Sequence, residues 1–165
     1  TGWNLKEVCE LKQQAFKSHR IPGIIEAEEF DTGCQEDAFL DSDEVNEGGA
    51  FRPNEPVDIE KCSAGTFNIG WTKKGEWLAY TVSVEKTAIY KVTFNTATNL
   101  NDASFHLEFD GADKSGIIIV PNSYGYQNWQ PVSKSIQLNS GKHVMKLVID
   151  SPGVNLDKIE FRRTN

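Results

Sequence analysis

The stretch WLAYTVSV, residues 77–84, alternates large apolar side chains with small or polar ones at every second position. Successive side chains of a β-strand point to opposite faces of a sheet, so this period of two places one row of side chains in a core. The pattern recurs, in longer or shorter runs, over 90–96, 105–109, 132–138, 143–149 and 155–161, and 117–120 is a short apolar run. From Ile24 onward we therefore expect a chain that is mostly β-strand.

Turn-forming residues separate several of these runs, at 110–111, 139–141 and 151–153. A parallel sheet needs a crossover between its strands, usually a helix, and no such spacing appears. We therefore predict an all-β fold, a β-sandwich of two antiparallel sheets. The segment 31–63 is rich in turn formers and carboxylates, and we expect loop with one or two short strands, including 56–60.

The N-terminal part differs from the rest, and we divide the chain into an N-terminal helical arm or linker, 1–20, and a β-sandwich domain, 21–165. The run 3–8 offers Asn4 as an N-cap, a reciprocal cap three residues later and a hydrophobic staple. A short helix is expected to begin there and to end at 21–23, which reads Ile-Pro-Gly. It would be either a packing arm or the tail of a preceding domain.

Composition and charge restrict the partners. A length of 165 residues suits one domain, and 38% hydrophobic and 25% charged residues are typical of a globular chain. The net charge is −7 and the 17 Lys and Arg residues are scattered, which disfavours nucleic acid and favours a neutral partner or a cation. The longest apolar run, 116–120, is too short to span a bilayer, and residues 1–3 do not begin a signal peptide, as expected of a mature or excised piece. We expect a monomer that binds neither nucleic acid nor membrane.

The three cysteines, Cys9, Cys34 and Cys62, show no CxxC spacing and no nearby pair of histidines, so a zinc site has little support. One disulfide with one odd thiol is possible. Of the three pairings we favour Cys34 with Cys62, since both flank a polar loop that a bridge would restrain. Three buried free thiols are the alternative.

Aromatic side chains lie among glycine and amide residues rather than inside apolar runs. Trp71 follows Asn-Ile-Gly at 68–70, and Trp129 lies in YGYQNWQ at 124–130. A sugar ring offers an apolar face and a fringe of hydroxyls, so proteins bind it with flat aromatic rings and polar side chains. The pattern favours carbohydrate binding, and the alternative is that these rings cap an open end of the sandwich. Trp77 is more typical of a core or strand-surface position.

Two glutamates, Glu26 and Glu28, share one face of the strand expected over 24–30, and two like charges so placed are costly unless they share a cation. Ca²⁺, a hard ion with oxygen ligands, would resolve this repulsion. Asp157 could supply a third carboxylate if its strand neighbours the first. The alternative is an ordinary solvated strand face.

The sequence offers few candidates for catalysis. The histidines at 19, 106 and 143 are isolated, and no Ser-His-Asp set can be assembled locally, so we expect that the chain is not an enzyme. One alternative is a purely structural or protein-docking sandwich. The other is a small glycosidase that uses two of the loop acids Asp41, Asp43, Glu55, Asp58 and Glu60.

Several ordered motifs together resemble the family 6 carbohydrate-binding modules. They are IIEAEEF at 24–30, FRPNEPVDIE at 51–60, FNIGWTKKGEWLAYTV at 67–82, YQNWQ at 126–130 and VNLDKIEF at 154–161. The resemblance covers about residues 21–163. It implies a β-sandwich of jelly-roll type that holds glycans without cleaving them and is appended to glycoside hydrolases and related secreted enzymes.

The resemblance also implies the residues of a loop-end cleft. Two aromatic rings sandwich a sugar, an asparagine of the last strand hydrogen-bonds it, an acid comes from the preceding loop, and further aromatics form the walls. Trp71 and Trp129 match the two rings, and Asn155 matches the asparagine. Glu60 or Asp58 matches the acid, and Tyr124 and Tyr126 match the aromatics of the walls.

The family's structural Ca²⁺ is similar to the ion that the carboxylate pattern suggests. The matching ligands are Glu26, Glu28, Asp157 and the carbonyl oxygen of Phe67, and Trp77 matches one aromatic of a second surface found in some members. We therefore predict a secreted, non-catalytic module that binds a neutral β-linked polysaccharide and keeps an attached enzyme near its substrate. β-1,3-glucan is the first candidate ligand, an agar-type galactan the second and xylan the third.

Overall fold

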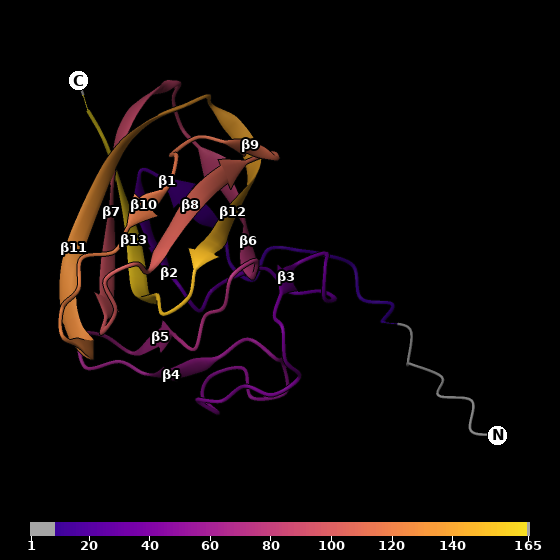
Figure 1. The fold of residues 1–165 in the computed structure, drawn as a ribbon. Helices are drawn as coiled ribbons and strands as arrows, with labels where there is room; N and C mark the ends of the chain where they lie inside the picture. The colour runs from indigo at the N-terminus through magenta and orange to yellow at the C-terminus, as the bar shows by residue number, and fades with distance from the viewer. Residues whose placement is uncertain (1–8, 165) are drawn as a thin grey trace.

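Two β-sheets face each other in the computed structural model, which describes residues 9–164 (Figure 1). One sheet has the order β1-β6-β12-β8-β10, with β3 beside β6 and β9 beside β8; the other has the order β11-β7-β13-β5-β4, with β2 beside β13. The strands of the first are β1 (His19–Ile21), β3 (Phe39–Leu40), β6 (Trp77–Val84), β8 (Ser104–Phe109), β9 (Ala112–Asp113), β10 (Ile118–Ile119) and β12 (Gly141–Ser151). Those of the second are β2 (Gly23–Glu26), β4 (Ile59–Lys61), β5 (Phe67–Ile69), β7 (Ala88–Thr98), β11 (Gly125–Leu138) and β13 (Asn155–Arg163). β1 pairs with β6 in parallel, and the other pairs of these strands are antiparallel.

The predicted β-sandwich is confirmed, because the residues with a period of two line one core. Leu78, Tyr80 and Val82 of β6 are all buried. Across the core, the rings of Phe94 from β7 and Phe105 from β8 lie 4.8 Å apart in an edge-to-face arrangement. Each large apolar side chain so buried contributes about 1.5–3 kcal/mol of transfer free energy, which makes this shared core the main support of the fold.

The predicted N-terminal helix is wrong over the residues that the structure describes. Residues 9–18 form no helix; the backbones of Gln14 and Thr32 exchange two hydrogen bonds, and β1 then pairs with β6. These contacts occupy backbone groups that a helix would need, so the segment is extended instead. The expected cap and staple at 3–8 lie outside the described residues. Within residues 9–164, no helix is long and apolar enough to cross a membrane.

The favoured disulfide pairing is also wrong, because Cys9 bonds with Cys34 and leaves Cys62 as a buried free thiol. The bridge ties the N-terminal segment to the loop before β3, with 5.9 Å between the two Cα atoms. Cys62 directly follows β4, and burial raises the pKa of its thiol. The polar loop between Cys34 and Cys62 is therefore held by other contacts.

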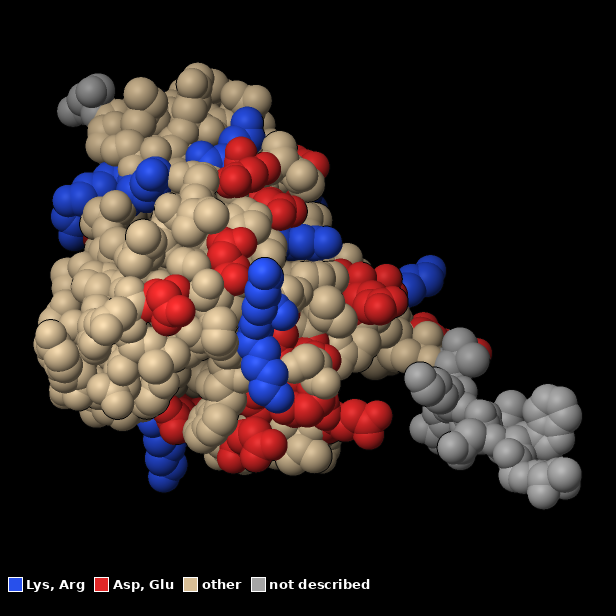
Figure 2. Space-filling view, viewed as in Figure 1, with Lys and Arg blue, Asp and Glu red and all other residues tan. Residues whose placement is uncertain are grey.

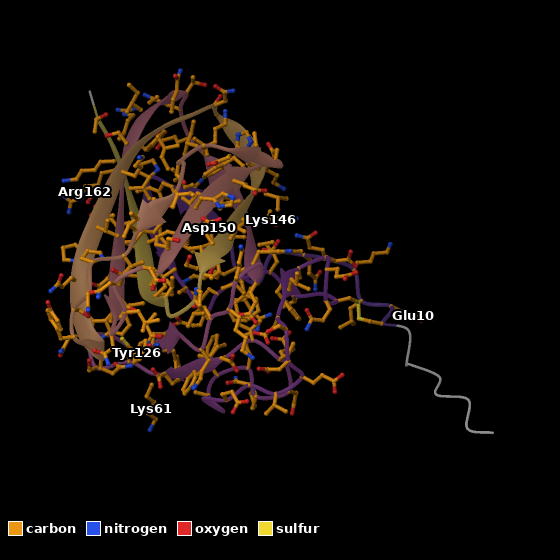
Figure 3. The ribbon with its side chains drawn as sticks, in the orientation of Figure 1. Glu10, Lys61, Tyr126, Lys146, Asp150 and Arg162 are labelled. Carbon is orange, nitrogen blue, oxygen red and sulfur yellow. A yellow bond between two sulfur atoms is a disulfide. The ribbon has the colours of Figure 1, made fainter. Side chains whose placement is uncertain are left out.

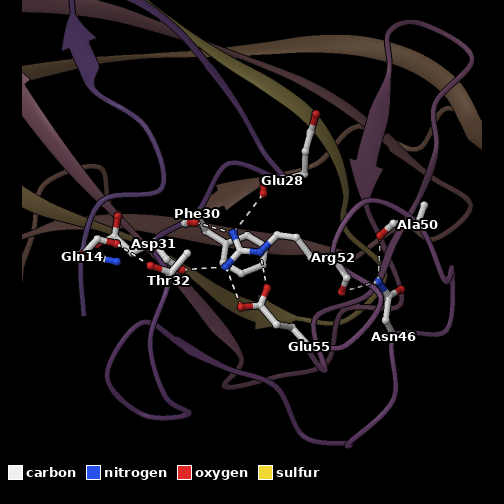
Figure 4. Close-up of polar contacts among 9 residues, drawn as sticks. All are labelled: Gln14, Glu28, Phe30, Asp31, Thr32, Asn46, Ala50, Arg52 and Glu55. Carbon is white, nitrogen blue, oxygen red and sulfur yellow. Dashed lines mark hydrogen bonds and ion pairs between the residues drawn. The ribbon is translucent and has the colours of Figure 1, made fainter. Parts of the chain in front are cut away.

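Arg52 anchors that loop from within (Figure 4). Its guanidinium donates to the backbone carbonyl oxygens of Phe30 and Asp31, forms an ion pair with Glu55, and lies 3.6 Å from the centroid of the Phe30 ring. Asn46 donates to two further carbonyl oxygens in the same loop. Because Arg52 is only 8% exposed, these contacts fix the loop against the chain that follows β2 and set the entry into β4.

Candidate functional site

A cleft of about 550 Å³ opens at the end of the sandwich where β11 and β13 begin, near the labelled Tyr126 in Figure 3. Its walls come from β4, from the loops that follow β5, β7 and β12, and from the starts of β11 and β13. The lining residues are Glu60, Trp71, Thr72, Lys73, Leu100, Tyr126, Gln127, Pro152, Gly153 and Asn155. The fold thus brings together four residues predicted from the sequence, namely Glu60, Trp71, Tyr126 and Asn155.

The polar side chains of the cleft are hydrogen-bonded to one another. Glu60 Oε1 accepts from the side-chain amides of Gln127 at 2.8 Å, Asn68 at 3.2 Å and Asn155 at 3.4 Å. Asn155, which is 3% exposed, also donates to the carbonyl oxygen of Tyr126 at 2.8 Å. This polar network is ordered before any ligand arrives, so less side-chain entropy is lost on binding.

Two aromatic rings are exposed in the cleft. The side chains of Trp71 and Tyr126 are 46% and 41% exposed, respectively, and they come from different parts of the chain. Large rings that stay in solvent beside a row of amides and a carboxylate are arranged for stacking against an apolar ring face with polar groups around its edge.

Trp71 is held in a left-handed backbone conformation with φ 49°, which costs a non-glycine residue about 1–2 kcal/mol. The N–H of Gly70 donates to the carbonyl oxygen of Asp58 at 3.1 Å. The Thr72 hydroxyl donates to the carbonyl oxygen of Val154 at 3.1 Å and accepts from its N–H at 2.8 Å. These bonds on both sides of Trp71 fix the direction in which its ring leaves the backbone, and nothing in the sequence signals this φ.

Trp129, which the resemblance places in the cleft, is not among the lining residues, so its contact with a sugar stays a prediction. Its ring is partly buried, and its indole N–H donates to Ser63 Oγ at 3.0 Å in the loop between β4 and β5. Tyr126 is the second aromatic ring among the lining residues.

Two other predicted residues lie outside the lining. Tyr124 is 81% exposed at the turn before β11, and Asp58 is 1% exposed with its Oδ1 accepting from the Glu47 N–H at 2.7 Å. Glu60 is thus the acid of the cleft. Six lining residues were not predicted from the sequence. Thr72, Lys73 and Gln127 lie in motifs already quoted, Pro152 and Gly153 lie in the predicted turn at 151–153, and Leu100 had no signal.

The predicted calcium ligands lie where β2 meets β13. β2 ends at Glu26, which corrects the strand expected over 24–30, because the N–H of Glu29 turns back to the carbonyl oxygen of Glu26 at 3.0 Å. The N–H of Ala27 donates to the carbonyl oxygen of Asp157 at 3.0 Å, so the first and last strands of this sheet are neighbours as expected.

Two of these carboxylates are buried and incompletely paired. Glu28 and Asp157 are 2% and 1% exposed, and Glu28 Oε2 and Asp157 Oδ1 have no hydrogen-bond partner among the described residues. Burial, followed by the nearby Glu26, raises the pKa of Glu28 to about 7. Orphaned carboxylate oxygens at low exposure fit a hard cation, so these residues suit the Ca²⁺ that the resemblance implies. In the structure of residues 9–164, Glu26, Glu28 and Asp157 do not bring one carboxylate oxygen each within 4.8 Å of the other two.

Comparison with known proteins shows the family of the chain. The family model for carbohydrate binding module (family 6) matches residues 49–163. The β-agarase AgaO of Microbulbifer thermotolerans is 30% identical over 127 residues, which are 72% of this chain and 11% of that protein. The C-terminal family 6 module of the laminarinase LamC from Zobellia galactanivorans has a TM-score of 0.67 at 25% identity and covers 86% of this chain and 98% of its own. A β-1,3-glucan-binding family 6 module from Bacillus halodurans gives 0.67 at 22% identity, with 88% and 99% covered.

The family match extends over the whole cleft, from Glu60 to Asn155. The chain therefore belongs to family 6 of the carbohydrate-binding modules, which hold carbohydrate without catalysing a reaction on it.

Proposed function

We propose that this chain binds a neutral β-linked polysaccharide in the cleft, with the rings of Trp71 and Tyr126 against a sugar and with Asn155 and Glu60 at its hydroxyls. The observation that carries the proposal is the pair of exposed rings beside an ordered network of amides and a carboxylate. Each stacked ring contributes about 1–3 kcal/mol, by analogy with base stacking, and each hydrogen bond about 1 kcal/mol. Affinities in the micromolar to millimolar range follow.

The preferred ligand is β-1,3-glucan. The relatives that support it are the module of a laminarinase and the module from Bacillus halodurans that is named for β-1,3-glucan binding. The agarase supports an agar-type galactan as the second candidate, and xylan is the third.

The biological role that we propose is targeting. The chain spans 11% of the length of its agarase relative, as an accessory module of a larger enzyme would. In a secreted protein such a module would keep an attached glycoside hydrolase near its substrate, and a structural Ca²⁺ at Glu26, Glu28 and Asp157 would join its first and last strands.

Isothermal titration of the chain with soluble β-1,3-glucan, agarose oligosaccharides and xylan tests the ligand. We expect saturable binding with the tightest dissociation constant for β-1,3-glucan, and weaker binding by Trp71→Ala and Tyr126→Ala. Absence of binding to all three glycans would overturn the proposal. Release of reducing sugar from any of them by the isolated chain would instead support the glycosidase alternative.

A further inference from the structure

A second group of acids lies apart from the expected calcium ligands, on the loop between β3 and β4. Asp41 and Asp43 follow β3, and Asp58 directly precedes β4; one carboxylate oxygen of each lies within 4.8 Å of the others. Figure 2 shows Asp and Glu side chains gathered on the part of the surface where Figure 1 places this loop. Acidic clusters are common on protein surfaces, and most bind no ion. Burial and hydrogen bonding of these three carboxylates distinguish them from such clusters.

The deepest of the three acids has an oxygen with no partner. Asp58 is 1% exposed; its Oδ1 accepts from the Glu47 N–H at 2.7 Å, whereas its Oδ2 has no hydrogen-bond partner within residues 9–164. Asp41 is 9% exposed. Burial, followed by neighbouring acids such as Glu76, raises the pKa of Asp41 to about 7, and burial, followed by Asp43 and Glu76, raises that of Asp58 to about 6. Buried carboxylates with an unpaired oxygen are costly unless a cation compensates them.

The cations in the described part of the chain do not supply that compensation. Lys73 reaches Asp43 Oδ2 at 3.3 Å, but its side chain is 57% exposed. The nearby Arg52 is committed to Glu55 and to backbone carbonyl oxygens. The buried Glu76 adds a further carboxylate near these acids. Its oxygens accept from the backbone N–H groups of Ser42 and Lys73 and from the Ser42 hydroxyl, and these donors carry no positive charge.

We propose that Asp41, Asp43 and Asp58 bind a divalent cation, and that the ion is Ca²⁺. An all-oxygen set of carboxylates on an irregular loop is the donor chemistry of a hard ion and disfavours zinc or copper, which prefer nitrogen and sulfur. A mostly apolar cavity of about 20 Å³ adjoins Asp41, Asp58 and Glu76, and Asp43 is not part of its lining. This site shares no residue with the Glu26, Glu28 and Asp157 set.

The site lies directly behind the wall of the cleft. The carbonyl oxygen of Asp58 accepts from the Gly70 N–H at 3.1 Å, and Lys73, whose ammonium contacts Asp43, lines the cleft. Trp71 lies between these two contacts. An ion at the three aspartates would therefore tie the β3–β4 loop to the segment that carries the tryptophan ring.

Calcium stoichiometry of the chelator-stripped chain tests the proposal. Asp58→Asn keeps the shape of the side chain and should lose one bound Ca²⁺, or weaken it at least tenfold, whereas Glu28→Gln should keep that ion. Glu44→Gln is the matched control, because Glu44 is an exposed acid of the same loop and its substitution changes the charge equally. Asp58→Asn that binds as much Ca²⁺ as Glu44→Gln, or Glu28→Gln that binds none, would overturn the site.

Thermal unfolding keeps the test decisive if a variant is hard to titrate. Removing an uncompensated buried charge should leave the melting temperature of Asp58→Asn in chelator at or above that of the wild type, and the calcium-dependent rise should shrink. A melting temperature that falls equally in chelator and in Ca²⁺ would show a structural role only. Asp43→Asn, at a half-buried position, gives a second variant with the same expectation.

Terbium luminescence provides a readout specific to this place. Trp77 lines the same small cavity as Asp41 and Asp58, so it should sensitise Tb³⁺ bound there. Trp77→Phe should reduce this emission at unchanged Ca²⁺ affinity, and Asp58→Asn should reduce both. Emission that survives Asp58→Asn at full intensity would place the ion elsewhere.

Discussion

Truncation of Trp71 to alanine should remove one wall of the cleft without unfolding the domain. A tryptophan side chain offers up to about 250 Å² of surface, so an exposure of 46% leaves on the order of 115 Å² available to a ligand. One ring face is roughly half of this, about 60 Å², and at ~25 cal/mol per Å² its burial is worth about 1.5 kcal/mol. The apolar face of the sugar that is buried against it brings the total to at most about 3 kcal/mol.

The expected result is a dissociation constant about 10- to 150-fold weaker for Trp71→Ala, measured by isothermal titration with β-1,3-glucan. Trp129→Ala is the matched control, because it removes the same side chain from a position outside the cleft lining, and its affinity should stay within about threefold of the wild type. Circular dichroism should show both variants folded. The reasoning is refuted if Trp129→Ala loses as much affinity as Trp71→Ala, or if Trp71→Ala binds like the wild type.

Four further predictions follow from the same contacts. Asn155→Ala should lose about 1–2 kcal/mol of binding free energy by titration, less than the tryptophan, because it removes hydrogen bonds only. Affinity for a neutral glycan should change little between low and high salt, and a steep fall would indicate a charged ligand. Burial lowers the pKa of His106, but the hydrogen bonds of His106 to Asp150 and Glu108 outweigh burial and raise this pKa above 6.5. The stability that these bonds add is therefore full below pH 6.5 and is lost as the pH rises through the raised pKa. His106→Asn should lower the melting temperature more at pH 5.5 than at pH 9. Saturation of the Glu28 and Asp157 site at a hundredfold excess of Ca²⁺ over the dissociation constant should add about 2.7 kcal/mol, or roughly 5–11 °C, and Glu28→Gln should lose that part of the calcium response.

The sequence was enough to predict the strands whose two faces differ. β6, β7 and β8 alternate apolar and polar side chains because one face meets the opposite sheet, and that periodicity is local. The sequence also predicted Trp71, Glu60 and Asn155 as residues of the cleft, through motifs whose order along the chain is typical of the family. These predictions depended on patterns that a reader can count along the chain.

The predictions that were wrong depended on contacts between distant segments. The N-terminal stretch has local helix signals, but Gln14 pairs with Thr32 and Cys9 bonds with Cys34, and neither partner can be read from the helix pattern. Tertiary pairing therefore overrode local preference at these places.

The charge arrangement of the cleft restricts the class of ligand more than its shape does. Glu60 Oε1 is already shared by amide donors from Gln127, Asn68 and Asn155, so this carboxylate lies within a network that has little freedom to rearrange. A uronic or sulfated sugar would bring a second anion beside it, on a protein of net charge −7, with Lys73 as the one cation of the lining and that lysine paired with Asp43. A neutral sugar instead offers hydroxyl donors to Glu60 and an apolar face to Trp71 and Tyr126, and it leaves no charge unpaired. Stacking then sets how tightly the glycan is held, and the fixed carboxylate and amides set which face and which hydroxyls are accepted.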